Sequence, residues 1–453
     1  MGRSLTTRRA LLRSCAGVAA LGSFSWERSA SSLGRTPVGG KLALVLPWPV
    51  NSIDPHDIFD SAGALFGHAV FYELFALDAS GDAYPTLASD VPIVDGGKTI
   101  VRLREGMTTS KGRKLDARDV VFSVARARRG AALAWWSDLP TPTPHPKDPL
   151  AVVFANADPT LLARTLSSPL LALVPRSFEP THPDGTGAMT AETSGARLVL
   201  RRNPNAARGA SFLDEITIEQ APDLLAPLRS FQGNLTDIGW LSSGLHAPRP
   251  GAQSFDLGSV AWIVLQTGSE AGPWGAPGIA QRLLDGLAPE RLERFGLGAL
   301  PPATGTAEWG GRPCELLVQE GSAYLADLAR TLSSLLSRPG HEVTARALSA
   351  AELANRRKSG AYSLLLGLVR PFGAPGVATL VALAAAADPL SAREIVRRPP
   401  RLTSFAPRVL TRTLKLGVLG ELRVAGAHAP DVHLPKNAGG DGWDLGSSYR
   451  GAT

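Results

Sequence analysis

Short apolar segments separated by turns dominate the chain beyond residue 35. Leu42 to Leu46 is a continuous apolar run before a proline, which predicts a buried strand. Thr99 to Leu103 alternates between two faces, and this period predicts a strand with one face in a core. Asp116 precedes an apolar helical stripe and has Asp119 three residues later, the pattern of a helix capping box. The alternation of strands and helices is typical of α/β proteins.

The second half of the chain shows the same pattern with longer elements. Glu315 to Val318 predicts a strand, Tyr324 to Ser337 a helix with a leucine stripe, and His341 to Ala347 a second strand. A β-α-β unit of this kind implies a parallel strand pair with a right-handed crossover. Val260 to Gln266 and Ala361 to Val369 predict two further buried strands. The longest apolar run is too short to span a bilayer.

A series of short motifs fills the stretch between residues 71 and 123. Phe71 to Phe75 predicts the apolar end of a helix, and Asp95-Gly96-Gly97 predicts a reversal in which glycine takes positive φ. The motifs are, in order, Tyr72-Glu73-Leu74, Asp78 with Gly81, Pro85-Thr86-Leu87-Ala88, Asp95-Gly96-Gly97-Lys98, Leu103-Arg104-Glu105-Gly106 and Ala117-Arg118-Asp119-Val120-Val121-Phe122-Ser123. In this order and spacing they resemble the solute-binding proteins of ABC importers, specifically family 5, the peptide/nickel-binding type.

The resemblance implies a fold and a division of the chain. The expected fold class is α/β, periplasmic-binding-protein-like type II, with two α/β lobes joined by hinge strands and an extra subdomain on lobe one. The implied segments are 1–35 (export signal and flexible lead), 36–57 (lobe one, first part), 58–175 (extra subdomain), 176–257 (lobe one, second part), 258–407 (lobe two) and 408–453 (return to lobe one).

The resemblance also implies a function. It is the capture of a small solute, peptide-like or other, in a cleft between the lobes, and its delivery to an ABC permease in the membrane. A monomer is expected, without enzymatic activity, cofactor, metal or nucleic acid. The residues expected to contact the ligand are Trp48, Asn51, Trp240, Trp262, Gln266 and Arg370.

One departure from the family pattern bears on the ligand. Peptide binders of the family carry an aspartate that pairs with the amino group of the ligand, after the strand that corresponds to residues 361–369. Here Pro371 stands at that position and Arg370 precedes it. A cationic amine would meet a like charge, so an anionic or neutral ligand fits better. The alternative is that Arg370 points outward into solvent.

Charge and cysteine content concern mainly the N-terminal segment. The formal net charge is +7, but residues 1–35 contain six arginines and one glutamate, a net of +5, which leaves about +2 for the rest and argues against nucleic-acid binding. Thr7 to Leu12 resembles the twin-arginine export motif and leads into a mildly apolar stretch. Export to the periplasm or another extracytoplasmic space is therefore expected. A plain basic tail or a transit peptide is the alternative.

Cys15 lies in this export segment, in a poor lipidation context because Arg13 precedes it. Cys314 would remain as the single thiol after processing, expected to be buried and inert.

No hydrolase elbow, zinc-protease, dithiol or phosphate-loop motif occurs. His428, Asp431 and His433 are close enough for a metal, but no regular element fixes them. Two other functions stay open. One is a degenerate member of the family that binds a partner or acts as a sensor without a transport ligand. The other is an exported enzyme.

Overall fold

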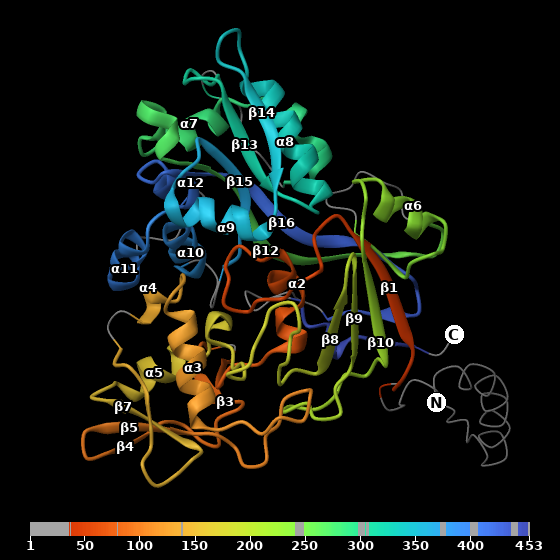
Figure 1. Ribbon diagram of the computed structural model, residues 1–453. Helices are drawn as coiled ribbons and strands as arrows, with labels where there is room; N and C mark the ends of the chain where they lie inside the picture. Colours follow the sequence, from red (N-terminus) through yellow and green to blue (C-terminus); the bar gives the residue numbers. More distant parts are fainter. Residues whose placement is uncertain are drawn as a thin grey trace, which may run out of the picture.

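The computed structural model describes residues 36, 38–78, 80–136, 139–240, 249–297, 304, 308–371, 377–398, 406–435 and 443–451 (Figure 1). The expected export segment, with Cys15, lies outside these residues, and so does the side chain of Trp240. None of the helices in these ranges is long and apolar enough to cross a membrane.

A curled ten-stranded sheet forms the frame of the molecule, with the strand order β14-β13-β15-β12-β16-β11-β1-β10-β9-β8. Its strands are β1 (Lys41–Leu46), β8 (Met189–Ser194), β9 (Arg197–Arg202), β10 (Glu215–Gln220), β11 (Ile238–Trp240), β12 (Gln253–Thr267), β13 (Cys314–Gln319), β14 (Val343–Leu348), β15 (Leu364–Val369) and β16 (Leu416–His428). The strands predicted from residues 42–46, 260–266, 315–318, 341–347 and 361–369 are all present.

Two lobes lie at the two ends of this sheet. Lobe one is β1 and β8 to β11 with α2 (Ser61–Val70) and α6 (Ala226–Gln232). Lobe two is β13 to β15 with α7 (Ile279–Asp285), α8 (Ala323–Leu336), α9 (Ala350–Ser359), α10 (Val377–Ala387), α11 (Pro389–Arg397) and α12 (Ala406–Thr411). β13 and β14 pair in parallel with α8 as the crossover, as the β-α-β pattern predicts.

The long strands β12 and β16 connect the lobes (Figure 1). They pair antiparallel along most of their length, from Gln253 opposite His428 to Gln266 opposite Leu416, with irregular register in the middle. β16 is one continuous strand from Leu416 to His428. A two-strand ribbon with interrupted register is a suitable hinge, because a few irregular positions absorb changes in φ and ψ.

A subdomain packs against lobe one and lobe two. It contains a four-stranded sheet, in the order β4 (Ile93–Asp95), β5 (Lys98–Arg102), β7 (Ala151–Ala155) and β6 (Thr143–Pro144), a hairpin of β2 (Phe75–Leu77) and β3 (Ala83–Pro85), and the helices α3 (Ala117–Ala127), α4 (Leu133–Trp136) and α5 (Pro159–Thr165). The remaining elements are the short pair β17 (Val432–His433) and β18 (Tyr449–Arg450) and the 3-10 turns η2 (Pro169–Leu171), η3 (Ser269–Gly275), η4 (Pro289–Arg291), η5 (Glu293–Phe295) and η6 (Leu445–Ser447). The exact segment bounds given above stay predictions.

The predicted local patterns in the subdomain are confirmed, with one exception. The Asp116 carboxylate accepts from the Arg118 N–H, and the Asp119 carboxylate accepts from the Asp116 N–H, so the capping box forms. The helix end predicted at Phe71 to Phe75 is wrong. α2 ends at Val70, and Phe71 is already extended, with φ −127° and ψ 143°.

The two faces of the sheet in lobe two belong to different cores. Leu364, Leu366 and Leu368 of β15 join the core that contains α2, α7 and α8. Val369, one residue further on, points to the opposite face and joins the core of α10, α11 and the subdomain. Because successive side chains of a strand point to opposite faces of the sheet, neighbouring residues of β15 contact different cores.

Candidate functional site

The lobes contact each other directly where lobe two meets the loop after β1. The Trp48 ring is 0 % exposed and stacks on the Tyr324 ring of α8, with 4.9 Å between the centroids and 26° between the planes. The Tyr324 N–H donates to the Pro47 carbonyl at 3.2 Å. Burial raises the pKa of the Tyr324 hydroxyl, which stays protonated and donates to the Phe295 carbonyl. Trp48 therefore packs at the junction between the lobes.

A second contact joins lobe two to residues 54–63, which precede α2 and form its first turn. Arg370 follows β15, is 4 % exposed, and donates from Nη1 to the Gly63 carbonyl at 2.9 Å and from Nη2 to the Pro55 carbonyl. Arg357 of α9 lies over the Phe59 ring, with 3.6 Å from its Cζ to the ring centroid. Burial lowers the pKa of both guanidinium groups, against the attraction of nearby carboxylates.

The acidic residues Asp54 and Asp60 at this second contact are held by hydrogen bonds. Arg126 of α3 donates to both carboxylate oxygens of Asp54, at 2.8 and 2.6 Å. Burial alone would raise the pKa of Asp54, but the pairing with Arg126 outweighs it and holds the pKa of Asp54 below its ordinary value. Asp60 caps α2 by accepting from the Ala62 N–H at 3.0 Å. Burial, with the charges of Asp57 and Asp54 adding to it, raises the pKa of Asp60 to about 7.

His56 lies among these groups as a neutral side chain. Burial lowers its pKa to about 4, and its Nε2 is 2.9 Å from the Ala172 carbonyl. Between pH 6.5 and 4, His56 is therefore protonated in the unfolded chain but neutral in the folded protein. The free energy of unfolding falls as the pH falls through this range. Asp60 acts in the opposite sense, because its folded form binds the extra proton between its ordinary pKa and about 7.

Replacing His56 by glutamine is expected to remove only the loss of folding stability that His56 causes as the pH falls. The difference in unfolding free energy between His56→Gln and the parent should shift in favour of the variant by about 3 kcal/mol from pH 7 to pH 4. Urea unfolding of both proteins at a series of pH values measures it. Because Asp60 is common to both proteins, its contribution cancels in the difference. A difference that does not change with pH would contradict a buried neutral His56.

The other predicted ligand contacts belong to other elements, although Trp262 lies opposite Val369, the residue before Arg370. Trp262 on β12 pairs with Val369, and both point to the α10 face of the sheet, with Trp262 partly exposed. Gln266, four residues along β12 on the same face, donates from Nε2 to the Ala386 carbonyl at 2.8 Å. Its Oε1 is buried and has no hydrogen-bond partner among the described residues. Asn51 is exposed in the loop after β1.

The structure thus distributes the six expected contacts over four places, one of which is the exposed loop of Asn51. Trp48 and Arg370 belong to contacts between the lobes. Trp262 and Gln266 line the face of the hinge strand toward α10. The backbone of Trp240 pairs with Gly426 of β16, which places this residue beside the hinge. Sequence reasoning missed Tyr324, Arg357 and the segment 54–63 as parts of the lobe junction.

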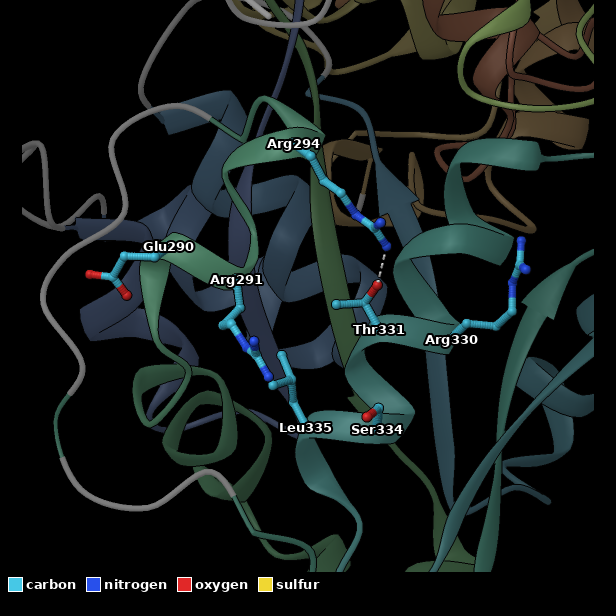
Figure 2. Close-up of a pocket in the computed structure, with 7 residues that line it drawn as sticks. All are labelled: Glu290, Arg291, Arg294, Arg330, Thr331, Ser334 and Leu335. Atoms are coloured by element: carbon cyan, nitrogen blue, oxygen red, sulfur yellow. Dashed lines mark hydrogen bonds between the residues drawn. The ribbon is translucent and has the colours of Figure 1, made fainter.

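A separate groove of about 510 Å³ opens on lobe two alone, between the η4–η5 segment and α8. Figure 2 shows Arg291 and Arg294 extending toward α8 and Glu290 pointing away, and the Arg294 guanidinium donates to the Thr331 hydroxyl at 2.7 Å. The groove is polar, and its charged residues are exposed. It does not involve lobe one, so closure of the lobes would not enclose a ligand there.

Two further candidates from the sequence are the possible metal ligands at residues 428–433 and the thiol of Cys314. The Asp431 carboxylate pairs with Arg450 at 2.8 Å, and His433 stacks on Tyr449. No group of three metal-binding side chains occurs in the part of the chain that the structure describes. Cys314 begins β13 and is half-buried, and burial raises the pKa of its thiol to about 11, which disfavours the reactive thiolate.

A protein family matches the central part of the chain. Residues 82–249 match the family described as bacterial extracellular solute-binding proteins, family 5, middle. This match confirms the family resemblance predicted from the motifs. No curated protein sequence matches the chain significantly.

Solved structures confirm the predicted fold class over nearly the whole chain. The oligopeptide-binding protein AppA from Bacillus subtilis, in complex with a nonapeptide, superposes with a TM-score of 0.67 at 13 % identity, covering 92 % of this chain and 100 % of that one. DppA from Helicobacter pylori, in complex with the peptide STSA, gives 0.67 at 13 % identity, covering 92 % and 99 %. NikA from Brucella suis, in complex with Fe(III)-EDTA, gives 0.58 at 15 % identity, covering 91 % and 100 %. At these identities the likeness concerns the fold.

Proposed function

We propose, from the family 5 match and the two-lobed fold, that this protein is an extracytoplasmic solute-binding protein. It captures a small solute between its lobes and delivers it to an ABC importer. The observation that carries the proposal is the pair of hinge strands, β12 and β16, which join two lobes in a fold shared with binding proteins for peptides and a metal chelate. A ligand that contacts both lobes favours the closed state by its differential affinity.

The solute is proposed to lie against the α10 face of the hinge strands. Trp262 offers a partly exposed ring there, and Gln266 offers a buried carbonyl oxygen with no hydrogen-bond partner among the described residues. An aromatic face with a few fixed polar groups is the usual lining of a small-molecule site. Trp240 and Asn51 are proposed to border the same cleft.

Export is part of the proposal. Family 5 proteins act outside the cytoplasm, and the Thr7 to Leu12 segment is proposed to direct this chain there by the twin-arginine route. The permease partner and the monomeric state are likewise proposed. The function is binding and delivery, without a chemical step.

Thermal unfolding in the presence of solute pools is the test. A solute at one hundred times its Kd should stabilise the folded protein by about 2.7 kcal/mol and raise the unfolding temperature accordingly. Trp262→Ala should reduce this shift. Trp274→Ala is the matched control, because Trp274 is a half-buried ring of lobe two that lies outside the hinge strands and packs on Trp309. Equal loss of the shift in both variants would contradict the proposed site.

The direct contacts of Trp48 and Arg370 across the junction favour one alternative. The same fold could hold its lobes together permanently and bind a membrane partner or act as a sensor. In that case no solute from broad peptide, opine and metal-chelate pools raises the unfolding temperature. Affinity capture from the membrane fraction would instead recover a partner.

A further inference from the structure

Arg370 directly follows β15, a strand of lobe two, and yet it makes its hydrogen bonds to lobe one. Its N–H donates to the Ile58 carbonyl at 2.9 Å. Its guanidinium donates to the carbonyls of Gly63 and Pro55. Three hydrogen bonds from one residue therefore cross the junction to a segment that lies some three hundred residues earlier in the chain.

The receiving segment is shaped for a guanidinium group. A Cβ on Gly63 would lie 2.6 Å from the Asp54 carbonyl oxygen, so the close approach of the first turn of α2 to the Asp54 backbone requires glycine. A Cβ on Gly67 would lie 3.6 Å from Nη1 of Arg370. The segment 54–63 with Gly67 is called the guanidinium socket below.

Nearby acidic residues also favour a cation in the guanidinium socket. The carboxylates that attract the Arg370 guanidinium are those of Asp60, Asp57, Asp54 and Glu73. The Asp54 carboxylate is fixed by Arg126, and the Asp60 carboxylate by two backbone N–H groups. Burying a cation is expensive unless hydrogen bonds and opposite charges compensate. The socket supplies nearby acids and hydrogen-bond acceptors for Nη1 and Nη2, while Nε has no hydrogen-bond partner among the described residues. Removal of the side chain would leave the Gly63 and Pro55 carbonyls without their guanidinium donors and the nearby carboxylates with one cation fewer.

We infer that Arg370 acts as a built-in ligand: its guanidinium fills a cation site on lobe one and holds the lobes closed without a bound solute. The guanidinium socket is then a recognition site for guanidinium compounds, occupied in the parent protein by the chain itself. This inference rests on the two-lobed fold and adds a regulation to the proposed function. The protein is closed at rest, and release of Arg370 must precede opening.

The energetic consequence is a shift of the closed–open equilibrium toward the closed state. A group that binds both lobes shifts that equilibrium only by its contacts in the closed form, and all of the contacts of the Arg370 side chain with the socket are of that kind. The same contacts exclude a cationic ligand group from the socket, because the site is already filled.

The test compares Arg370→Met with Arg346→Met by small-angle X-ray scattering without solute. Methionine keeps much of the length of the side chain and removes the charge. Arg346 is the matched control, because it pairs with Glu315 on the surface of lobe two at 2.9 Å and does not reach lobe one. The radius of gyration should increase in Arg370→Met and stay at the parent value in Arg346→Met.

Chemical rescue makes the test specific. Methylguanidine, at concentrations well below those that unfold proteins, should return the radius of gyration of Arg370→Met toward the parent value and raise its unfolding temperature by several degrees. Sodium chloride at equal ionic strength should do neither. The parent and Arg346→Met should not respond to methylguanidine, because their sockets are filled.

Three outcomes would overturn the inference. They are a parent-like radius of gyration in Arg370→Met, no rescue by methylguanidine, or equal rescue by sodium chloride. If Arg370→Met does not fold, Arg370→Lys replaces it, since lysine keeps the charge but cannot donate to two carbonyls in a fixed fork. A parent-like radius in Arg370→Lys would then count against the inference. Solute binding by the parent protein is measured separately, so failure here leaves the proposed function untouched.

Discussion

Substituting alanine for Gly187 is expected to destabilise the protein by at least about 3 kcal/mol, at or beyond the upper end of overpacking effects. A Cβ at this position would lie 2.4 Å from the Ala69 carbonyl oxygen and 2.5 Å from the Val70 carbonyl carbon. Both are backbone atoms at the end of α2, so rotation of a side chain cannot relieve the clash. The Gly187 N–H also donates to the Val70 carbonyl at 2.9 Å, which fixes the approach.

Urea unfolding of Gly187→Ala against Gly130→Ala measures this effect. At Gly130 the nearest atom to a new Cβ is the Ala127 carbonyl oxygen at 3.6 Å, an ordinary contact, and the position does not require positive φ. Gly130→Ala should therefore unfold close to the parent. Equal midpoints for the two variants would mean that the segment around Gly187 does not lie against α2 as described.

Truncating Trp48 to alanine is expected to reduce the unfolding free energy by about 4 kcal/mol, as for other fully buried large aromatic residues. The local loss of stability should be largest at the junction of the lobes, because the Trp48 ring packs on Tyr324 of lobe two. Trp48→Phe keeps a ring in the same place and should recover most of the stability. The pair of variants thus separates loss of the stacked contact from loss of the indole alone.

Hydrogen exchange at the Tyr324 amide reports the position of this loss. That N–H donates to the Pro47 carbonyl across the junction. Its protection should fall in Trp48→Ala more than the protection of the β13 amides, which pair within lobe two. Uniform loss of protection throughout the protein would place the role of Trp48 in the folding of lobe one and not in the contact between the lobes.

Much of the fold could be predicted from the sequence because its elements follow local rules. The Asp116 capping box, the alternation from Thr99 to Leu103 and the β-α-β unit around α8 depend on neighbours within a few turns or strands. The helix end predicted at Phe71 to Phe75 failed because the apolar character of these residues serves a tertiary core. Phe71 packs on Phe178, with 5.6 Å between the ring centroids.

The lobe junction could be predicted only in part. The proline-flanked Trp48 and the unusual Arg370 stood out as residues, but their partners could not be identified, because Tyr324 and Gly63 lie hundreds of residues away from them. Arg370 has apolar neighbours in sequence, and its compensating charges come from residues 54, 57, 60 and 73. A local pattern carries no signal for such a contact. The run of acids between residues 54 and 60 is the one feature that could have suggested a buried cation nearby.

Native mass spectrometry of the protein exported by its own cells tests the central claim most directly. The account predicts that the intact protein carries the mass of a small molecule in addition to the polypeptide. Mild unfolding should release this molecule, and adding it back to the emptied protein should raise the unfolding temperature. A bare polypeptide mass, together with no stabilisation by cell extract or solute pools, would contradict solute capture between the lobes.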